Sequence, residues 1–214
     1  MKIVPAILAE NFDDFTALLA QAESFTDYVQ IDIMDGVFVE SKSFPVEGIN
    51  EVATPLIFEV HLMVKDPLST MSKITHRGLR KVIFHFEAVT DHCTLISEIR
   101  RRGFVPGMAV NPETGTDRFE KVIGSVDTLL FLTVDPCCYG RPFRPEVLEK
   151  IAEVKKAFPD KVIAADGGVS LENLKGFHDI GTDYVCVGSR IFLKGDAGTN
   201  YRLFLEKLRE LEQA

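Results

Sequence analysis

The stretch Gln30-Ile-Asp-Ile-Met-Asp-Gly36 is the most informative one for the fold. Polar and apolar residues alternate from Gln30 to Ile33 and a glycine follows at position 36, as in a buried β-strand that ends in a loop. Side chains at positions i and i+2 of a strand share a face, so Gln30 and Asp32 point the same way. Two more stretches are typical of strand ends, Glu59-Val-His-Leu-Met63 and Ala164-Ala-Asp-Gly-Gly168.

Short apolar or β-branched runs alternate with amphipathic stretches along the whole chain of 214 residues. Eight such βα repeats predict an α/β protein with a single (β/α)8 TIM barrel, forming one domain over residues 1–214. A doubly wound open sheet is the alternative, and the lack of a G-x-G-x-x-G after the first run disfavours it. A closing helix is predicted over Thr199–Gln213. The predicted strands are Ile3–Leu8, Tyr28–Ile33, Leu56–Met63, Lys81–Phe86, Val105–Val110, Thr128–Thr133, Lys161–Asp166 and Tyr184–Gly188.

The composition is that of a soluble globular protein, with 46% hydrophobic and 26% charged residues. A net charge of -8 disfavours nucleic acid and anionic membranes as partners, because both require a basic face. No run approaches the ~20 apolar residues of a membrane span, and the first apolar run is too short for a signal peptide. Four irregularly spaced cysteines argue against a disulfide framework. A cytoplasmic location is therefore expected.

Polar residues gather where the predicted strands end, which is where barrels of this kind carry their chemistry. Asp32, His61 and Asp166 come from three distant segments and offer the oxygen and nitrogen ligands of one divalent metal. We therefore expect an enzyme. The polar residues at or just beyond strand ends are Asp32, Asp35, His61, His85, Glu87, Asn111, Asp135, Asp166 and Ser189.

Along nearly its whole length the chain resembles the ribulose-phosphate 3-epimerase family. The resemblance implies a (β/α)8 barrel that interconverts ribulose 5-phosphate and xylulose 5-phosphate. It also implies a divalent metal held by two histidines and two aspartates, which double as acid and base. The matching stretches are Val4-Pro-Ala-Ile-Leu8, Ile31-Asp-Ile-Met-Asp-Gly36, Val60-His-Leu-Met-Val64, Phe84-His-Phe-Glu87, Gly107-Met-Ala-Val-Asn-Pro112 with Thr114, Thr133-Val-Asp-Pro136, Asp166-Gly-Gly-Val169 and Gly188-Ser-Arg-Ile-Phe192.

The resemblance assigns roles position by position. Asp32 and Asp166 resemble the metal-bound carboxylates that remove and return a proton on opposite faces of the substrate. His61 resembles a metal-bound histidine. The other matched positions line the substrate: Met34 and Met63 against water, and Gly167, Gly168, Gly188 and Ser189 around the phosphate.

Gln30 stands where the family places its first metal histidine, two residues before Asp32. An amide oxygen ligates hard cations but replaces imidazole poorly for zinc. We therefore expect a metal site of Gln30, Asp32, His61 and Asp166 that favours Mn²⁺ or Mg²⁺ among Zn, Mn, Fe, Co and Mg. The alternative is that Gln30 only hydrogen-bonds Asp32 and the metal is lost.

The chain departs from the family pattern at three further places: Ala6 replaces a serine, Leu132 replaces a methionine, and Pro136-Cys-Cys-Tyr-Gly-Arg141 replaces a glycine-rich mobile loop. Gly140 and Arg141 of this loop, with Arg190, are predicted to bind substrate. One of the two arginines is expected to reinforce phosphate binding, the alternative being that both are solvated.

The remaining polar residues have simpler interpretations. Glu59 either orients His61 or fills polar space lower in the barrel, and the first is preferred. His85 and Glu87 are predicted to form a structural hydrogen-bonded pair. The neighbouring cysteines 137 and 138 are interpreted as small apolar loop residues, because no further metal ligand lies at suitable spacing.

Three functions compete. The first is epimerisation of a pentose phosphate or of another ketose phosphate such as allulose 6-phosphate. The second is a related decarboxylase or aldolase, disfavoured because the Asp-x-Lys-x-x-Asp of those barrels reads Glu59-Val-His-Leu-Met-Val64 here, without a lysine. The third is a sugar-phosphate-binding protein without catalysis. The expected partner is a small sugar phosphate, and family members suggest a homo-oligomer, either a dimer or a hexamer.

Overall fold

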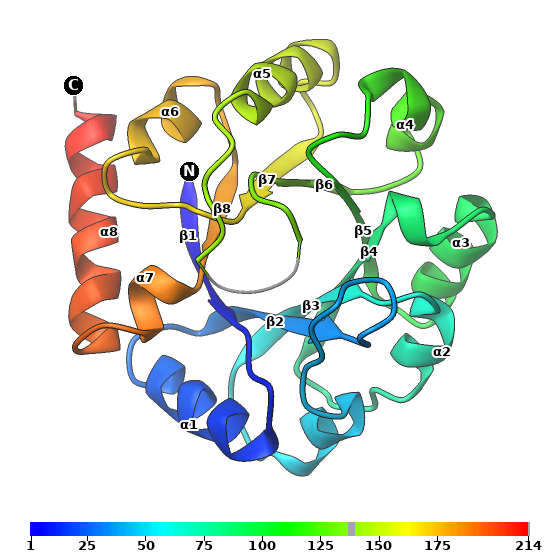
Figure 1. Cartoon of the computed structure of the whole chain (residues 1–214), viewed down its shortest axis with the longest axis horizontal. Helices are drawn as coiled ribbons and strands as arrows, with labels where there is room; N and C mark the ends of the chain where they lie inside the picture. Colours follow the sequence, from blue (N-terminus) through cyan, green and yellow to red (C-terminus); the bar gives the residue numbers. More distant parts are fainter. Residues whose placement is uncertain (137–139, 214) are drawn as a thin grey trace.

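The computed structural model describes residues 1–136 and 140–213, and its strands close into a parallel barrel in sequence order (Figure 1). The first strand pairs with both the second and the eighth, so the predicted (β/α)8 barrel is confirmed and the open sheet is excluded. Predicted strand ends agree with the observed ones to within two residues, and Val105–Val110 was predicted with both of its ends. The strands are β1 (Lys2–Ile7), β2 (Tyr28–Met34), β3 (Ile57–Met63), β4 (Leu79–His85), β5 (Val105–Val110), β6 (Thr128–Leu132), β7 (Val162–Asp166) and β8 (Tyr184–Val187).

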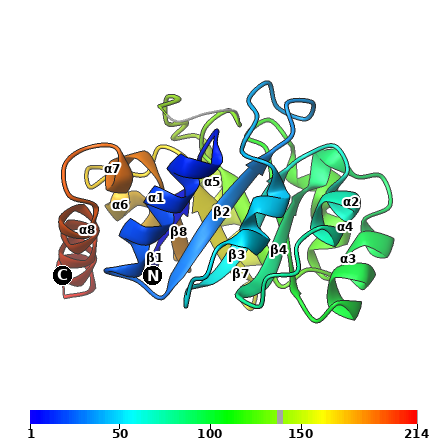
Figure 2. The same ribbon diagram turned by 90° about the horizontal axis from the view of Figure 1, so that it is seen from below.

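Helices surround the barrel on its outside, and the loop after β2 rises above the strand ends (Figures 1 and 2). The predicted closing helix is present, beginning two residues earlier than expected. Within the described ranges, every helix is too short or too polar to span a bilayer. The helices are α1 (Phe12–Glu23), η1 (Val46–Glu51), α2 (Pro67–Ser72), η2 (Phe86–Ala88), α3 (His92–Arg101), α4 (Thr116–Ile123), α5 (Val147–Ala157), α6 (Leu174–Asp179), α7 (Ser189–Phe192) and α8 (Ala197–Glu212).

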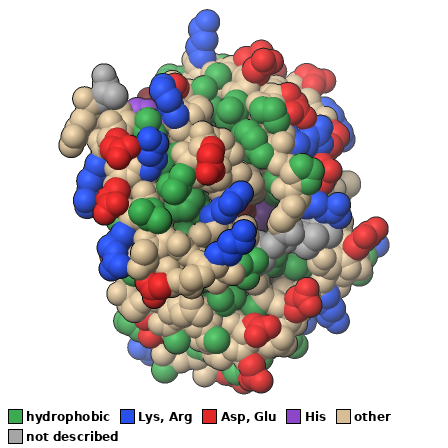
Figure 3. All heavy atoms as spheres, turned by 60° about the vertical axis from the view of Figure 1, so that its left-hand side comes forward, with side chains coloured by type: hydrophobic (Ala, Val, Ile, Leu, Met, Phe, Trp, Pro, Cys, Tyr) green, Lys and Arg blue, Asp and Glu red, His purple; other side chains and the backbone are tan. Residues whose placement is uncertain are grey.

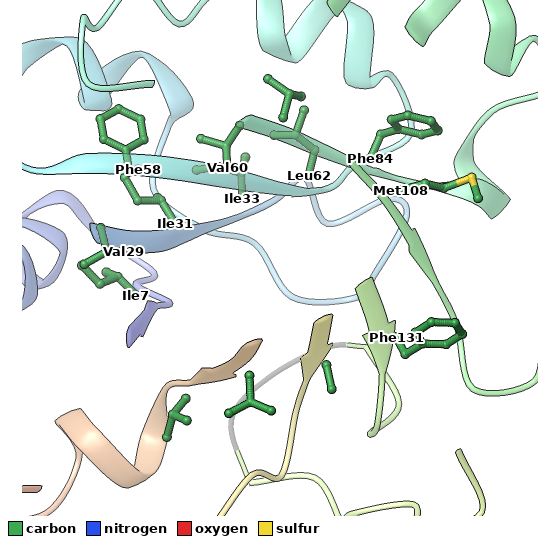
Figure 4. Close-up of a cluster of buried hydrophobic side chains, with 14 of the residues drawn as sticks. Ile7, Val29, Ile31, Ile33, Phe58, Val60, Leu62, Phe84, Met108 and Phe131 are labelled. Atoms are coloured by element: carbon green, nitrogen blue, oxygen red, sulfur yellow. The ribbon is translucent and has the colours of Figure 1, made fainter. Parts of the chain in front are cut away.

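The alternation along β2 and β3 divides the side chains between two environments. Val29, Ile31 and Ile33 of β2 belong to the main apolar core, together with alternate residues of β3 (Figure 4). The intervening residues Gln30 and Asp32 are also buried, and they belong to the interior of the barrel. Because successive strand side chains point to opposite faces, one apolar core holds the strand while its polar face supplies the site.

A buried ionic cluster fills the interior of the barrel below the rim. Glu59 is fully buried and accepts hydrogen bonds from Tyr28 Oη at 2.8 Å and from Tyr184 Oη at 3.1 Å. Lys81 Nζ lies 2.9 Å from the same carboxylate. Burial beside Glu59 raises the pKa of both tyrosines, so they remain donors. Glu59 therefore fills polar space lower in the barrel, which was the less favoured interpretation.

Candidate active site

A cavity of about 360 Å³ opens at the carboxyl ends of the strands. Figure 3 shows basic side chains beside a hollow with a histidine at its floor, and the basic residues that line the cavity are Arg141 and Arg190. Cysteines 137 and 138 lie outside the described residues. The structure brings eleven of the sequence-predicted site residues to this cavity: Asp32, His61, Met63, Gly140, Arg141, Asp166, Gly167, Gly168, Gly188, Ser189 and Arg190.

Asp32, His61 and Asp166 form one compact group at the floor of the cavity. Strand register places Asp32 directly beside His61, and closure of the barrel brings Asp166 from β7 to the same point. His61 Nδ1 lies 3.1 Å from Asp32 Oδ1 and 3.4 Å from Asp166 Oδ2. One ligand atom from each residue lies within 4.8 Å of the others. Two carboxylate oxygens and an imidazole nitrogen at this separation fit a divalent cation.

Gln30 lies next to this group, but its amide nitrogen faces the carboxylates. Nε2 donates to Asp32 Oδ1 at 2.9 Å and to Asp166 Oδ2 at 2.7 Å, while Oε1 accepts from Cys186 Sγ at 3.1 Å. The opposite amide orientation would place an oxygen against two carboxylate oxygens, so the hydrogen-bond network favours the observed one. In this orientation Gln30 bridges the two aspartates and offers no ligand atom to a cation.

The charges of the group follow from its burial. Burial raises the pKa of Asp32 to about 6, and Asp166 adds repulsion, while hydrogen bonds from His61 and Gln30 act in the opposite direction. Burial alone would lower the pKa of His61, but its hydrogen bonds to Asp166 and Asp32 outweigh that effect and raise it to about 9. Without a cation, His61 is therefore protonated at neutral pH and compensates part of the carboxylate charge.

A series of buried side-chain contacts leads from His61 away from the cavity. His61 Nε2 lies 2.9 Å from His85 Nε2, and His85 Nδ1 lies 3.4 Å from Glu87 Oε2. Glu87 Oε1 accepts from the backbone N–H of Asn111 and from Thr114 Oγ1. Burial lowers the pKa of His85 to about 4, whereas hydrogen bonds hold the pKa of Glu87 near 2 against the effect of its own burial. The predicted pair thus reaches His61, which the sequence analysis did not foresee.

Gly167 at the edge of the cavity requires its residue type. Gly167 has a φ of +103°, and a Cβ atom there would lie 2.4 Å from Val134 Cγ2. Asn173, missed in the sequence analysis, donates to the carbonyl oxygen of Gly168 at 2.9 Å and accepts from the backbone N–H of Ser170. An asparagine shortly after a Gly-Gly turn was the available signal. The backbone can therefore approach a ligand closely at this loop.

Part of the cavity wall is apolar, where Leu8 and Met63 line it. Met34 and Met63 pack with Val39 in a separate buried cluster, and Leu8 and Phe38 cover it. Met34 belongs to this cluster without lining the cavity itself. A wall of this kind excludes water from one side of the carboxylates, which strengthens electrostatic interactions there.

The raised pKa of His61 predicts a pH-dependent stability of the metal-free protein. The native state keeps a proton that the unfolded chain releases near pH 6.5, so the free energy of unfolding should fall as the pH rises from about 6.5 to about 9. The raised pKa of Asp32 and the lowered pKa of His85 affect the free energy of unfolding only below about pH 6.5. Denaturant unfolding after chelator treatment measures the slope, and the His61→Asn variant should flatten it. An NMR titration of His61 near pH 6.5 in the native protein would contradict this expectation.

Comparison with known proteins identifies the family of this chain. The family model described as ribulose-phosphate 3 epimerase family matches residues 2–192. Ribulose-phosphate 3-epimerase from Encephalitozoon cuniculi is 34% identical over 197 residues, covering 91% of this chain and 89% of that protein. The enzyme of the same name from Schizosaccharomyces pombe is 28% identical over 197 residues, covering 89% of this chain and 86% of that protein.

Among solved structures, 3-hexulose-6-phosphate synthase from Salmonella typhimurium has a TM-score of 0.70 at 18% identity, covering 99% of this chain and 100% of that one. At this identity the likeness supports the barrel fold alone. The family model and the relatives carry the assignment further: the chain belongs to the ribulose-phosphate 3-epimerase family, a family of isomerases.

Proposed function

We propose that this protein interconverts D-ribulose 5-phosphate and D-xylulose 5-phosphate by moving a proton between the two faces of carbon 3. The observation that carries the proposal is the pair Asp32 and Asp166, whose oxygens meet at one point on the cavity floor. Inverting a carbon beside a ketone requires a proton to leave one face and another to arrive on the opposite face. A carboxylate on each face performs both steps without moving the substrate. Family membership supports the assignment.

The surroundings suit these two carboxylates to act as acid and base. In the metal-free site, burial brings the pKa of Asp32 to about 6, so this carboxylate is poised to accept and release a proton near neutral pH. His61 holds the inner oxygens of Asp32 and Asp166, leaving their other oxygens for the substrate. The apolar wall that Met63 and Leu8 form, with Met34 packed in the same cluster, limits exchange of the transferred proton with water.

Asp32, His61 and Asp166 are proposed to hold a divalent cation, with Mn²⁺ or Mg²⁺ preferred. When bound, such a cation polarises the substrate carbonyl and stabilises the enediolate. Gln30 becomes the fourth ligand if its amide turns over, which brings Oε1 to the carboxylates and Nε2 to Cys186 Sγ. Because the amide nitrogen bridges the two aspartates, turning the amide over to complete the metal site would break both of these hydrogen bonds.

The phosphate is proposed to lie against Gly167, Gly168, Gly188 and Ser189, with Arg190 as an added cation. The loop that contains Gly140 and Arg141 borders the same cavity and is proposed to distinguish pentose phosphates from other ketose phosphates. Assembly into a dimer or hexamer and a cytoplasmic location stay predictions.

The function is tested by incubating the protein with ribulose 5-phosphate in D₂O and following xylulose 5-phosphate together with deuterium at carbon 3. We expect labelled product. Asp32→Asn and Asp166→Asn should each lower kcat at least about 10²-fold, because each removes the acid or base of one face. Asp13→Asn, a change of an exposed helical aspartate, is the matched control. Binding with neither product nor label would instead support a non-catalytic sugar-phosphate protein.

The proposed metal ligands predict a gain of affinity on replacing Gln30. Gln30→His should tighten Zn²⁺ binding by about tenfold or more, because imidazole is the better zinc ligand. Gln30→Ala, which removes the side chain without supplying a ligand, should not. Calorimetric titration of the chelator-treated proteins measures both. Equal Zn²⁺ affinities in all three proteins would place residue 30 outside the coordination sphere.

The role of Arg190 predicts a separate effect on substrate affinity. Arg190→Ala should raise KM by about tenfold and leave kcat nearly unchanged, because a charge-assisted hydrogen bond to phosphate acts equally on ground state and transition state. Lys194→Ala, a cation beyond α7, is the control. If KM is the same in both variants, Arg190 does not touch the phosphate.

A further inference from the structure

The side chains of His85 and Glu87, which follow His61 in this series of contacts, determine which ring nitrogens of His61 carry protons. His61 Nε2 and His85 Nε2 are 2.9 Å apart, and both side chains are fully buried. Two imidazole nitrogens at hydrogen-bond distance share one proton, so one must donate and the other must accept. Which ring donates therefore depends on the next contact, at His85 Nδ1.

The carboxylate of Glu87 makes that contact and determines whether His85 Nδ1 carries the proton. Its Oε2 lies 3.4 Å from His85 Nδ1. The side chain of Asn111 is a further hydrogen-bond partner of His85 and acts on the pKa of His85 in the same direction as Glu87. Glu87 Oε1 is already held by the N–H of Asn111 and the hydroxyl of Thr114. An ionised carboxylate only accepts, so the proton of His85 lies on Nδ1 and the lone pair lies on Nε2. His61 must then donate from Nε2.

We propose that His85 and Glu87 are positioning residues that set the tautomer of His61, so that its Nδ1 lone pair is presented to the cation between Asp32 and Asp166. This inference rests on the proposed function, because only a metal-binding His61 needs that lone pair. These contacts run from the Glu87 carboxylate through the His85 and His61 imidazoles to the cation. In the common arrangement a carboxylate orients the metal-binding histidine directly, so this one contains an additional imidazole. Glu59 is excluded from the role, because its partners lie lower in the barrel.

The Glu87→Gln variant gives a sharp test, because the surroundings determine how the new amide lies. Asn111 and Thr114 donate to the Oε1 position, so the amide oxygen belongs there and the NH₂ group faces His85 Nδ1. That NH₂ group requires an acceptor, so the proton of His85 moves to Nε2 and His61 must accept at its own Nε2. The proton of neutral His61 then lies on Nδ1, where it blocks the cation.

Two measurements follow. Long-range ¹H–¹⁵N NMR spectra of the metal-free wild-type protein, recorded above pH 9 so that His61 is neutral, should show His85 protonated on Nδ1. In Glu87→Gln under the same conditions they should show it protonated on Nε2. Mn²⁺ titration should give a dissociation constant at least about tenfold higher in Glu87→Gln than in wild type. Glu113→Gln, at an exposed rim glutamate paired with Arg144, is the matched control and should bind Mn²⁺ like wild type.

Wild-type His85 protonated on Nε2 would overturn the inference, and that result needs no variant to fold. An unchanged Mn²⁺ affinity in a folded Glu87→Gln protein would overturn it as well. Neither measurement uses substrate, so they separate this inference from the proposed function. A protein with the expected tautomer and Mn²⁺ affinity that fails to epimerise ribulose 5-phosphate would refute only the proposed function.

Discussion

Two buried carboxylates held at one point are the constraint on which the site depends. Asp32 and Asp166 repel each other in a medium that screens charge poorly, and the fold must compensate them. The N–H groups of Gln30 and a protonated His61 do so in the structure described here. A divalent cation would compensate the negative charge of the two aspartates more completely. The floor of the cavity is therefore built to receive positive charge, whichever group supplies it.

Much of this arrangement was predictable from local patterns. Alternation along β2 and β3 indicated that Gln30 and Asp32 share a face, as do Glu59 and His61, and eight repeats implied that barrel closure would add Asp166. The amide orientation of Gln30 was not predictable, because it depends on Asp166 and Cys186, more than 130 residues away in the sequence. The preferred role of Glu59, which was to orient His61, was wrong for a similar reason, because its partner Tyr184 comes from a distant segment of the chain.

Glu59 also shows why position on a face does not by itself define a role. It lies two residues before His61 and points into the same interior, yet it belongs to a lower layer with Tyr28, Tyr184 and Lys81. Branched aliphatic residues usually fill this layer in such barrels. Here an ion pair with two tyrosine donors fills it. A buried carboxylate is tolerable there because its oxygens have several partners.

The polar interior also explains how residue 30 is held. Burial and the nearby carboxylates raise the pKa of the Cys186 thiol, so it stays protonated and donates to Gln30 Oε1. The carboxylates hold the amide nitrogen from above while the thiol holds the oxygen from below. A cation that recruits the amide oxygen must reverse both contacts, although a thiol can also accept an N–H weakly. The glutamine thus lowers metal affinity through the hydrogen bonds it already makes, beyond the weaker ligation of an amide oxygen.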